Sequence, residues 1–420
     1  MKESKYNLVY DINENEKIIY NTRTLGLAVL TENEYDILKK SGKTNSDKKI
    51  VEDLYESGFL VDDDANEILV LRNRLNSERY SKEVLRMTIA PTLNCNFSCE
   101  YCYEQCGEKK VNVIMNDNTQ EKLFEFMCER STAAKKIEVV WYGGEPLLAM
   151  GVIERLSKKI IKLCENKKIE YTSSMITNGY LLNKEIIQQI KECKIQTLQI
   201  TLDGPQEIHD SRRILRNGQQ TFEKILSNIE ALDNSIEIVI RTNVDKTNQE
   251  YVYRLIEQIA SIGKTNLMFN IANVKSEKNK ENLLSMDEFA RVWLSSNDMC
   301  EKCNVKHGSY CMPKGANYCD ADSDNSFVID SEGYIYKCWQ DIGNKKSSIG
   351  SLNERLKFSS LYYDYMTFDA TEDKVCKECT LLPLCMGGCP YERVHNEDKC
   401  PMYKKIIKDI VFRLANYEEN

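Results

Sequence analysis

The chain has 420 residues, of which 42% are hydrophobic and 29% are charged, and 57 Lys and Arg against 65 Asp and Glu give a formal net charge of −8. This length allows two or three domains, and the acidic balance disfavours a nucleic-acid partner, because proteins that bind nucleic acids usually present a basic surface. No apolar run approaches the roughly 20 residues that span a bilayer, and the first residues contain no apolar signal core, so we expect a cytoplasmic protein without a membrane partner.

Residues 1–80 contain no cysteine and combine polar turns with short apolar pieces. Thr31 is a suitable helix N-cap, because Glu34 stands three residues later and completes a capping box. The pattern predicts a hairpin, two short helices and a strand, in that order at residues 8–20, 31–39, 47–57 and 59–61. We interpret this region as a winged-helix-like domain. An irregular extension of the main domain is the alternative.

Residues 84–275 alternate between apolar runs of strand length and amphipathic helical patterns. Such alternation predicts a parallel sheet, and six βα units predict a partial (β/α)6 TIM barrel of the α/β class. The expected strands are residues 85–90, 137–142, 171–177, 197–202, 236–242 and 267–271. In such barrels the chemistry takes place at the carboxyl ends of the strands, so the loops that follow the strands are where site residues are expected.

The loop after the first expected strand contains Cys95, Cys99 and Cys102, three of the chain's seventeen cysteines. Cytosolic thiols stay reduced and seventeen is an odd number, so metal binding is a better explanation than a disulfide framework. Three thiolates on one tight loop can hold three irons of a [4Fe–4S] cube and leave the fourth iron open to a ligand. A zinc knuckle or spare thiols are the alternative.

This loop resembles the signature of the radical S-adenosylmethionine (SAM) family, in which an aromatic residue, here Tyr101, precedes the third cysteine. The resemblance implies a cluster whose open iron binds the methionine part of SAM. In that family an electron from the cluster splits SAM into methionine and a 5′-deoxyadenosyl radical. The cofactors supply this chemistry, and the protein orients them.

Motifs similar to those of the family follow the later expected strands. The resemblance implies that the loop of Gly143, Gly144, Glu145 and Pro146 holds the SAM ammonium, and that Thr177 and Asn178 lie near its ribose. Asp203 opens a stretch in which one arginine pairs with the SAM carboxylate, and we favour Arg213 over Arg212 for this role. Arg241 belongs to the motif after the fifth strand. His209 is interpreted as a structural hydrogen-bonding residue.

Residues 300–401 are rich in cysteine and resemble the SPASM extension found on some radical SAM enzymes. The matching positions are Cys319, Cys338, Cys376, Cys379, Cys385, Cys389 and Cys400. SPASM domains usually hold two auxiliary [4Fe–4S] clusters, so the resemblance implies three clusters in all. Two zinc knuckles are the alternative. Residues 402–420 are expected to form a C-terminal helix.

The family pattern divides these cysteines between the two auxiliary clusters. Cys376, Cys379, Cys385 and Cys400 match the second cluster, whereas Cys319, Cys338 and Cys389 match the first. Cys311 is a possible fourth ligand of the first cluster, which is otherwise open to substrate. The other cysteines have no assigned ligand role: Cys128, Cys164 and Cys193 are expected in helices, Cys106 follows the first loop, and the role of Cys300 and Cys303 is ambiguous.

The resemblance to SPASM enzymes leads to a function. Their sulfatase-maturing branch typically has an aspartate base after the cysteine that matches Cys338, where this chain has Trp339. We therefore expect a maturase that forms a cross-link, a Cys thioether, in a ribosomally made precursor peptide. Residues 1–80 would recognise the leader of that precursor by pairing with a β-strand. A flavodoxin- or ferredoxin-type protein is the expected reductant.

Several alternatives remain open from the sequence. The same radical chemistry would serve formylglycine formation of the sulfatase-maturase kind, carbon–carbon cross-linking, or epimerisation of a peptide. A multi-cluster electron carrier is a second class, although a carrier gains nothing from an iron that is open to a reactant. A zinc-stapled binding module is a third, and the iron content and colour would separate it from the enzyme.

Overall fold

The computed structural model describes residues 1–40, 48–103, 113–275, 280–308, 319–354, 357–395 and 399–416. The chain forms two compact units. Unit 1 comprises Met1–Tyr80, Ser309–Ser323 and Met366–Asn420, and unit 2 comprises Ser81–Gly308 and Asp324–Tyr365. Residues 300–401 are therefore divided between the units. No helix within the described ranges combines the length and the apolar composition that a membrane crossing requires.

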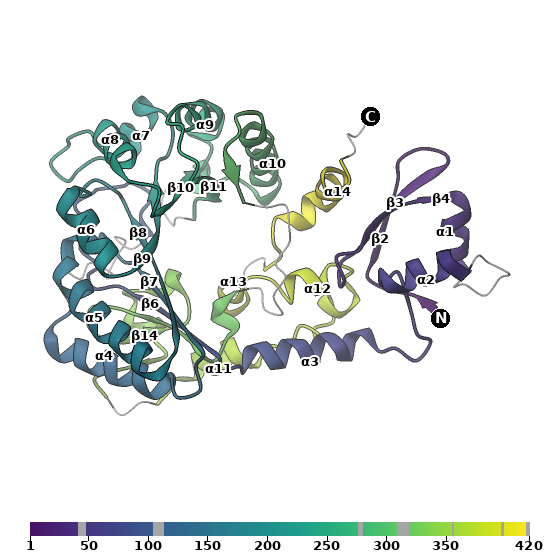
Figure 1. Cartoon of the computed structure of the whole chain (residues 1–420), viewed down its shortest axis with the longest axis horizontal. Coiled ribbons are helices and arrows are strands. Elements are labelled where there is room, and N and C mark those ends of the chain that lie inside the picture. Colours follow the sequence, from purple (N-terminus) through teal and green to yellow (C-terminus); the bar gives the residue numbers. More distant parts are fainter. Residues whose placement is uncertain are drawn as a thin grey trace. The chain divides into compact units, whose positions relative to one another are not determined.

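Unit 2 is built on one mixed sheet whose centre is parallel (Figure 1). All six expected strands are present and pair in parallel with their sequence neighbours, as β6 (Val84–Ile89), β7 (Lys136–Trp141), β8 (Glu170–Thr177), β9 (Ile195–Thr201), β10 (Glu237–Val244) and β11 (Leu267–Asn273). The prediction of a parallel α/β sheet is thus confirmed. Because parallel strands share one direction, the loops after them meet at one edge of the sheet.

Helices connect these strands, and α4, α5 and α6 line the outer side of the sheet in Figure 1. Leu156 and Ile160 of α5 are fully buried, as expected for the apolar stripe of a helix that covers a sheet. The helices of this unit are α4 (Asp117–Arg130), α5 (Met150–Lys167), α6 (Lys184–Glu192), α7 (Gln206–Arg212), α8 (Phe222–Ala231), α9 (Val252–Ser261) and α10 (Met286–Lys302); α11 (Ser360–Thr367) crosses its boundary.

The sheet also extends at both edges by strands that the sequence analysis did not predict. β12 (Lys306–His307) pairs in parallel with β11, and β13 (Ser326–Ile329) pairs in parallel with β6. β14 (Tyr334–Tyr336) and β15 (Gly350–Ser351) continue antiparallel beyond β13. These strands have two to four residues, and runs this short carry almost no periodic signal.

The N-terminal part of unit 1 begins with a three-stranded antiparallel sheet of β2 (Asn7–Asp11), β3 (Glu16–Asn21) and β4 (Leu27–Thr31). The expected hairpin, both helices and the strand are present, as β2–β3, α1 (Glu32–Lys39), α2 (Lys48–Glu56) and β5 (Leu60–Val61), which pairs with β1 (Lys2–Glu3). Thr31 and Glu34 form the expected capping box. The sequence analysis missed α3 (Glu67–Arg79).

The rest of unit 1 is the cysteine-rich lobe with its short helices α12 (Leu382–Cys385) and α13 (Pro390–Val394) and the expected C-terminal helix, α14 (Tyr403–Leu414). Its apolar residues share a core with the N-terminal part: Tyr6, Leu71, Leu75, Ala370, Cys376, Leu382 and Met386. Arg72 of α3 adds ion pairs to Asp369 and Glu372. Residues 1–80 and the lobe are therefore held together by packing.

Candidate active site and cysteine centres

The cysteine loop of Cys95, Cys99 and Cys102 follows β6, where the parallel sheet predicts site residues. Isolated bridges anchor the loop at two points, before Cys95 between Thr92 and Ile114, and between Cys95 and Cys99 where Phe97 pairs with Leu215. Burial raises the pKa of Cys95 and of Cys99 above the ordinary thiol value. Thiols in such surroundings stay protonated until a metal displaces the proton. Three thiols on one anchored loop fit a cluster with one open iron.

Gly143 and Gly144 bring the loop after β7 against the cysteine loop. A Cβ on Gly144 would lie 2.5 Å from the Leu93 carbonyl oxygen and 2.5 Å from the Asn94 carbonyl carbon. The Glu145 N–H donates to the Asn94 carbonyl at 2.7 Å. Glycine is therefore required at both positions, because the backbone of this loop lies too close to the backbone of the cysteine loop to leave room for a side chain.

The Glu145 carboxylate joins the loop after β7 to the loop after β8 from a fully buried position. It accepts hydrogen bonds from the Leu147 N–H at 3.0 Å, the Thr177 hydroxyl at 2.7 Å and the Asn178 N–H at 2.7 Å. Burial raises the pKa of Glu145, although these three donors oppose the shift. Asn178 also donates to Asn96 Oδ1 at 2.8 Å, inside the cysteine loop. The loops after β6, β7 and β8 thus form one connected network, with Pro146 opening the short helix beside it.

Tyr101 joins the cysteine loop to the strands on its other side. Its hydroxyl donates to the buried Asp203 carboxylate. The same oxygen accepts from Arg213 Nη1 at 2.6 Å and from Asn243 Nδ2 at 3.2 Å. Arg241, on β10, contacts this group indirectly through a 3.2 Å hydrogen bond to Asn243. The Tyr101 hydroxyl therefore joins the cysteine loop after β6 to residues at the ends of β9 and β10.

The two neighbouring arginines have different surroundings. Arg212 forms ion pairs with Asp245 at 2.9 Å and with Asp203 at 3.5 Å. Arg213 is 8% exposed and has an unpaired Nε. Among the described residues no carboxylate lies within ion-pair distance of Arg213. Burial opposes its charge, but Cys99, Tyr101 and Asp203 raise the pKa of Arg213 well above its usual value.

His209 has the structural role expected from the sequence. Its Nδ1 accepts from the Asp203 N–H at 3.2 Å, and its Nε2 faces the Thr221 hydroxyl at 3.1 Å. Since Thr221 donates to the Arg213 carbonyl, Nε2 is the protonated nitrogen. Burial and the two arginines lower the pKa of His209 well below its ordinary value. A fully bonded neutral imidazole holds the Asp203–Arg213 segment and is not placed to act as a base.

In unit 1, four cysteines line a single cavity: Cys376, Cys379, Cys385 and Cys400. Lys404 of α14 lines the same cavity and lies 3.6 Å from the Cys400 sulfur. Gly388 brings the backbone into direct contact with Lys399, where a Cβ would overlap the main chain. Four thiols around one apolar cavity match the donor set of a [4Fe–4S] cluster.

The other proposed ligands lie in different parts of the chain. Cys319 and Cys389 are both in unit 1 and interact electrostatically, whereas Cys338 follows β14 in unit 2. Cys311 and Cys106 lie outside the described residues. Over the described ranges, no three His, Cys, Asp or Glu side chains converge on a single ion position. A four-iron cube binds each thiolate through a different iron, so its ligands need not converge in this way.

The structure places the unassigned cysteines in ordinary positions. Cys164 and Cys193 are buried, as predicted for core residues, and Cys128 is half-buried. Burial raises the pKa of Cys300, at the end of α10, to about 12. Such a thiol is protonated at neutral pH and is therefore a poor nucleophile. Cys300 is therefore not an activated thiol in this structure.

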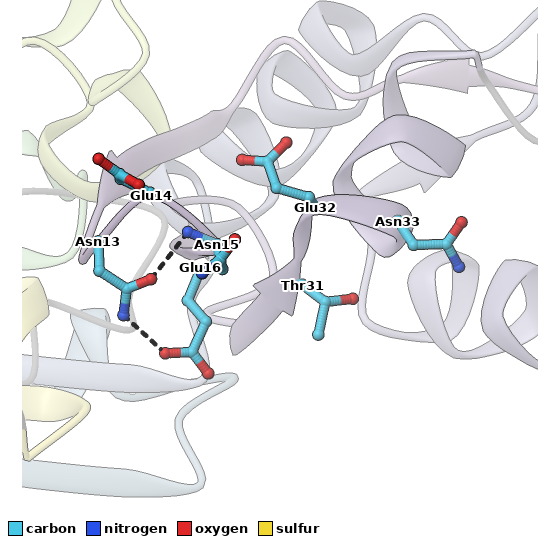
Figure 2. A pocket seen from close by; sticks show the side chains of 7 residues that line it. All are labelled: Asn13, Glu14, Asn15, Glu16, Thr31, Glu32 and Asn33. Carbon is cyan, nitrogen blue, oxygen red and sulfur yellow. Dashed lines mark hydrogen bonds between the residues drawn. The ribbon is translucent and has the colours of Figure 1, made fainter.

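A shallow hollow lies elsewhere in unit 1, between the β2–β3 turn and the start of α1 (Figure 2). The turn closes on itself, because Asn13 donates to Glu16 at 2.9 Å and accepts from the Asn15 N–H at 2.8 Å. The lining residues are Asn13, Glu14, Asn15, Glu16, Thr31, Glu32 and Asn33. None of them is a cysteine or a predicted site residue.

Two asparagines of the network were not predicted as site residues. Asn96 lies inside the cysteine loop, and Asn243 follows Arg241 by two residues. Each lies within a sequence motif that was already assigned to the site, and this position is the signal that could have identified it. A third unpredicted feature is the contact of Trp339 with Tyr142, whose ring centroids are 5.1 Å apart. The Tyr142 hydroxyl in turn meets that of Tyr103, next to Cys102.

Comparison with known proteins gives a consistent result. The family model described as the Radical SAM superfamily matches residues 89–277. The chain is 21% identical over 356 residues to the serine-type anaerobic sulfatase-maturating enzyme of Klebsiella aerogenes, covering 80% of this chain and 87% of that protein. It is 22% identical over 404 residues to the radical SAM cyclopropyl synthase TigE of Paramaledivibacter caminithermalis, covering 87% and 83%.

Solved structures share the fold at low sequence identity. Native anSMEcpe with bound AdoMet superposes with a TM-score of 0.65 at 20% identity, covering 79% of this chain and 98% of that one. Streptococcus suis SuiB bound to precursor peptide SuiA superposes with a TM-score of 0.56 at 16% identity, covering 95% and 97%. The second match extends over nearly the whole chain and therefore includes much of the N-terminal part.

Proposed function

This chain is a SAM-dependent enzyme with a radical SAM domain, homologous to anaerobic sulfatase-maturating enzymes, and we propose that it cross-links a ribosomally made precursor peptide. The bond we propose is a thioether between a cysteine and a carbon atom. The observation that carries this choice is Trp339, which stands where an acidic base would be needed for the sulfatase-type reaction.

The proposed first centre consists of Cys95, Cys99 and Cys102 with SAM on the open iron. A bound cluster and SAM supply a 5′-deoxyadenosyl radical, which removes a hydrogen atom from the substrate. Arg213 would pair with the SAM carboxylate, because it is a buried guanidinium with no carboxylate partner in the described structure. The loop from Gly143 to Pro146 would bind the SAM ammonium, and Thr177, Asn178, Asp203 and Arg241 would shape the remaining contacts.

Two auxiliary [4Fe–4S] clusters complete the proposal. The four-cysteine cavity of Cys376, Cys379, Cys385 and Cys400 supports the second of them. Cys319, Cys338 and Cys389 would hold the first, with Cys311 as its fourth ligand or with an iron open to the substrate thiolate. An open iron would stabilise the thiolate form of the substrate cysteine, whose proton would be released to solvent, since thiols bind metals as thiolates.

A peptide substrate is supported by the relatives, since SuiB shares this fold and was solved with its precursor peptide. We propose that residues 1–80 are a winged-helix-like domain that recognises a leader segment. Residues 84–275 would form the catalytic barrel, 300–401 the SPASM domain and 402–420 a terminal helix. A flavodoxin- or ferredoxin-type protein would supply the electron.

Formylglycine formation is the second candidate function, because the relative from Klebsiella aerogenes named above is an anaerobic sulfatase-maturating enzyme. That reaction leaves an aldehyde on the peptide, which a hydrazide probe detects. A thioether leaves no aldehyde. A sulfatase-derived cysteine peptide incubated with the enzyme, SAM and dithionite therefore distinguishes the two candidates directly.

The thioether proposal can be tested with any cysteine-containing peptide that a short reading frame beside this gene encodes. Each peptide is incubated anaerobically with reconstituted enzyme, SAM and dithionite. We expect a mass loss of about 2 Da per cross-link, one hydrogen from each bonded atom, together with loss of alkylation at that cysteine. A modified peptide that keeps all its free thiols would contradict the thioether and favour carbon–carbon coupling or epimerisation.

Replacing Trp339 by alanine is expected to raise KM for a modified peptide about tenfold. Trp339 is 36% exposed, and one side of its ring contacts the ring of Tyr142. The other side is free to contact the substrate. An aromatic contact of this kind contributes about 1 kcal/mol of binding free energy in addition to the contribution from the apolar area that it buries. Trp339→Phe should restore KM to within about threefold of the wild-type value. Tyr253→Ala is the matched control, since Tyr253 is 38% exposed on α9. An unchanged KM in Trp339→Ala would exclude this positioning role.

A further inference from the structure

Val375 is an exposed apolar residue beside a redox site. Its side chain is 69% exposed, and it lines the cavity of the four cysteines directly before Cys376. Leu381 and Leu382 line the same cavity but are buried. Packing within unit 1 thus accounts for the leucines and leaves Val375 in contact with water. A partner protein that contacts Val375 would therefore lie close to the cavity, because Cys376 is the next residue in the chain.

The charges around Val375 are unbalanced. Lys374 and Lys404 are exposed, and neither forms an ion pair within the described ranges. Of the neighbouring acids, Asp373 pairs with Lys399 at 3.0 Å and Asp369 with Arg72 at 3.4 Å, whereas Glu378 is exposed and forms no ion pair within the described ranges. The whole chain is acidic at −8, so this face is a local positive exception. We name Lys374, Val375 and Lys404 the Val375 face.

We propose that the Val375 face is the docking surface for a small acidic one-electron carrier of the flavodoxin or ferredoxin class. The inference rests on the proposed function, because it takes the four-cysteine cavity to hold an auxiliary cluster. One electron passes from the reduced cluster to the oxidised carrier, and no bond is formed or broken in this step. The electron is the one released when the substrate carbon radical closes onto the thiolate sulfur.

Physical chemistry favours this arrangement for a transient partner. Lysines around an apolar centre steer an acidic carrier and speed its encounter, and such complexes bury little surface and dissociate quickly. Association should weaken at high salt, because these charges are exposed and screened over a Debye length of roughly 10 Å at 0.1 M. A leader peptide with acidic residues is the competing occupant.

The experiment measures binding of two oxidised probes, an FMN-loaded flavodoxin and a [2Fe–2S] ferredoxin, to the full-length reconstituted enzyme. Binding is followed anaerobically at about 50 mM and about 300 mM NaCl. Lys374→Glu combined with Lys404→Glu should raise Kd for at least one probe by about tenfold or more at the lower salt. The matched control reverses two exposed lysines on unit 2, Lys158 and Lys224, and should change Kd by less than about twofold.

Lys404 contacts the Cys400 sulfur, so its replacement also changes the surroundings of the proposed centre. The single variants Lys374→Glu and Val375→Asp test the face and leave that contact in place. Both single variants should weaken binding, keep the wild-type iron content, and slow re-oxidation of the reduced enzyme by the carrier. Equal weakening in the control pair, unchanged Kd in both single variants, or failure of both carriers to bind would overturn the proposal. A single turnover of the pre-reduced enzyme needs no carrier, because the released electron can remain on the enzyme. Failure to modify the peptide under these conditions would therefore contradict the proposed function instead.

Discussion

Replacing Cys95, Cys99 and Cys102 together by alanine is expected to abolish formation of 5′-deoxyadenosine from SAM. The wild-type enzyme should hold about 12 irons per chain, and the triple variant about eight, because one four-iron cube loses every ligand that the protein supplies. The cavity of Cys376, Cys379, Cys385 and Cys400 belongs to unit 1 and the cysteine loop to unit 2, so the auxiliary centres should persist. Iron analysis, electron paramagnetic resonance and chromatography of the nucleoside measure these outcomes.

The matched control for this variant removes three other thiols. Cys128, Cys164 and Cys193 lie in or beside the helices of unit 2 and belong to no proposed centre. Their replacement by alanine should leave the iron content and SAM cleavage close to wild-type values. Continued 5′-deoxyadenosine formation in the Cys95–Cys99–Cys102 variant would refute the first centre. A preparation that saturates at about four irons with zinc present would refute the auxiliary clusters.

Gly144→Ala is expected to lower SAM cleavage by about 100-fold or more. The added methyl would lie 2.5 Å from two backbone atoms of Leu93 and Asn94, and main chain cannot give way as a side-chain tip can. The cysteine loop would therefore shift, and a displacement of the order of 1 Å at a reactive centre costs about 100-fold in rate. The rate of 5′-deoxyadenosine formation and the iron content of the first centre measure the effect.

Gly151→Ala provides the control in the same stretch of chain. Gly151 lies in the first turn of α5, where a Cβ would meet only the Arg155 guanidinium at an ordinary 3.6 Å. Alanine favours a helix over glycine by up to about 1 kcal/mol, so this variant should keep its activity and be equally or more stable to heat. A wild-type rate of SAM cleavage in Gly144→Ala would contradict this prediction. It would mean that the cysteine loop and the loop after β7 can move apart without loss of activity.

The sequence by itself determined the features that depend on local pattern. The six parallel strands were predictable because each is an apolar run of strand length, and each of β6 to β11 contains at least three buried residues. The capping box of Thr31 and Glu34 was predictable because its chemistry lies within four consecutive residues. The cysteine loop was recognisable for the same reason, since its three thiols lie within eight residues.

Only the tertiary structure decided which residues meet across long stretches of chain. It separated Arg212, which is neutralised by Asp245, from Arg213, which faces Tyr101 and the cysteine loop. Adjacent residues of the same type give no local signal of where their side chains point. Asp245, the partner of Arg212, lies more than thirty residues further along the chain. Tyr101, the partner of Arg213, lies more than one hundred residues before it.

The same limit applies to the two units. The sequence suggested that residues 1–80 form a separate domain, because they lack cysteine. The structure adds that Tyr6, Leu71 and Leu75 share a core with Cys376 and Leu382, about three hundred residues later. The apolar face of α3 lacks a strong helical periodicity, so its role in that core could not be read locally. Contacts between distant segments arise from the complementary surfaces of whole elements, and these surfaces exist only once the chain has folded.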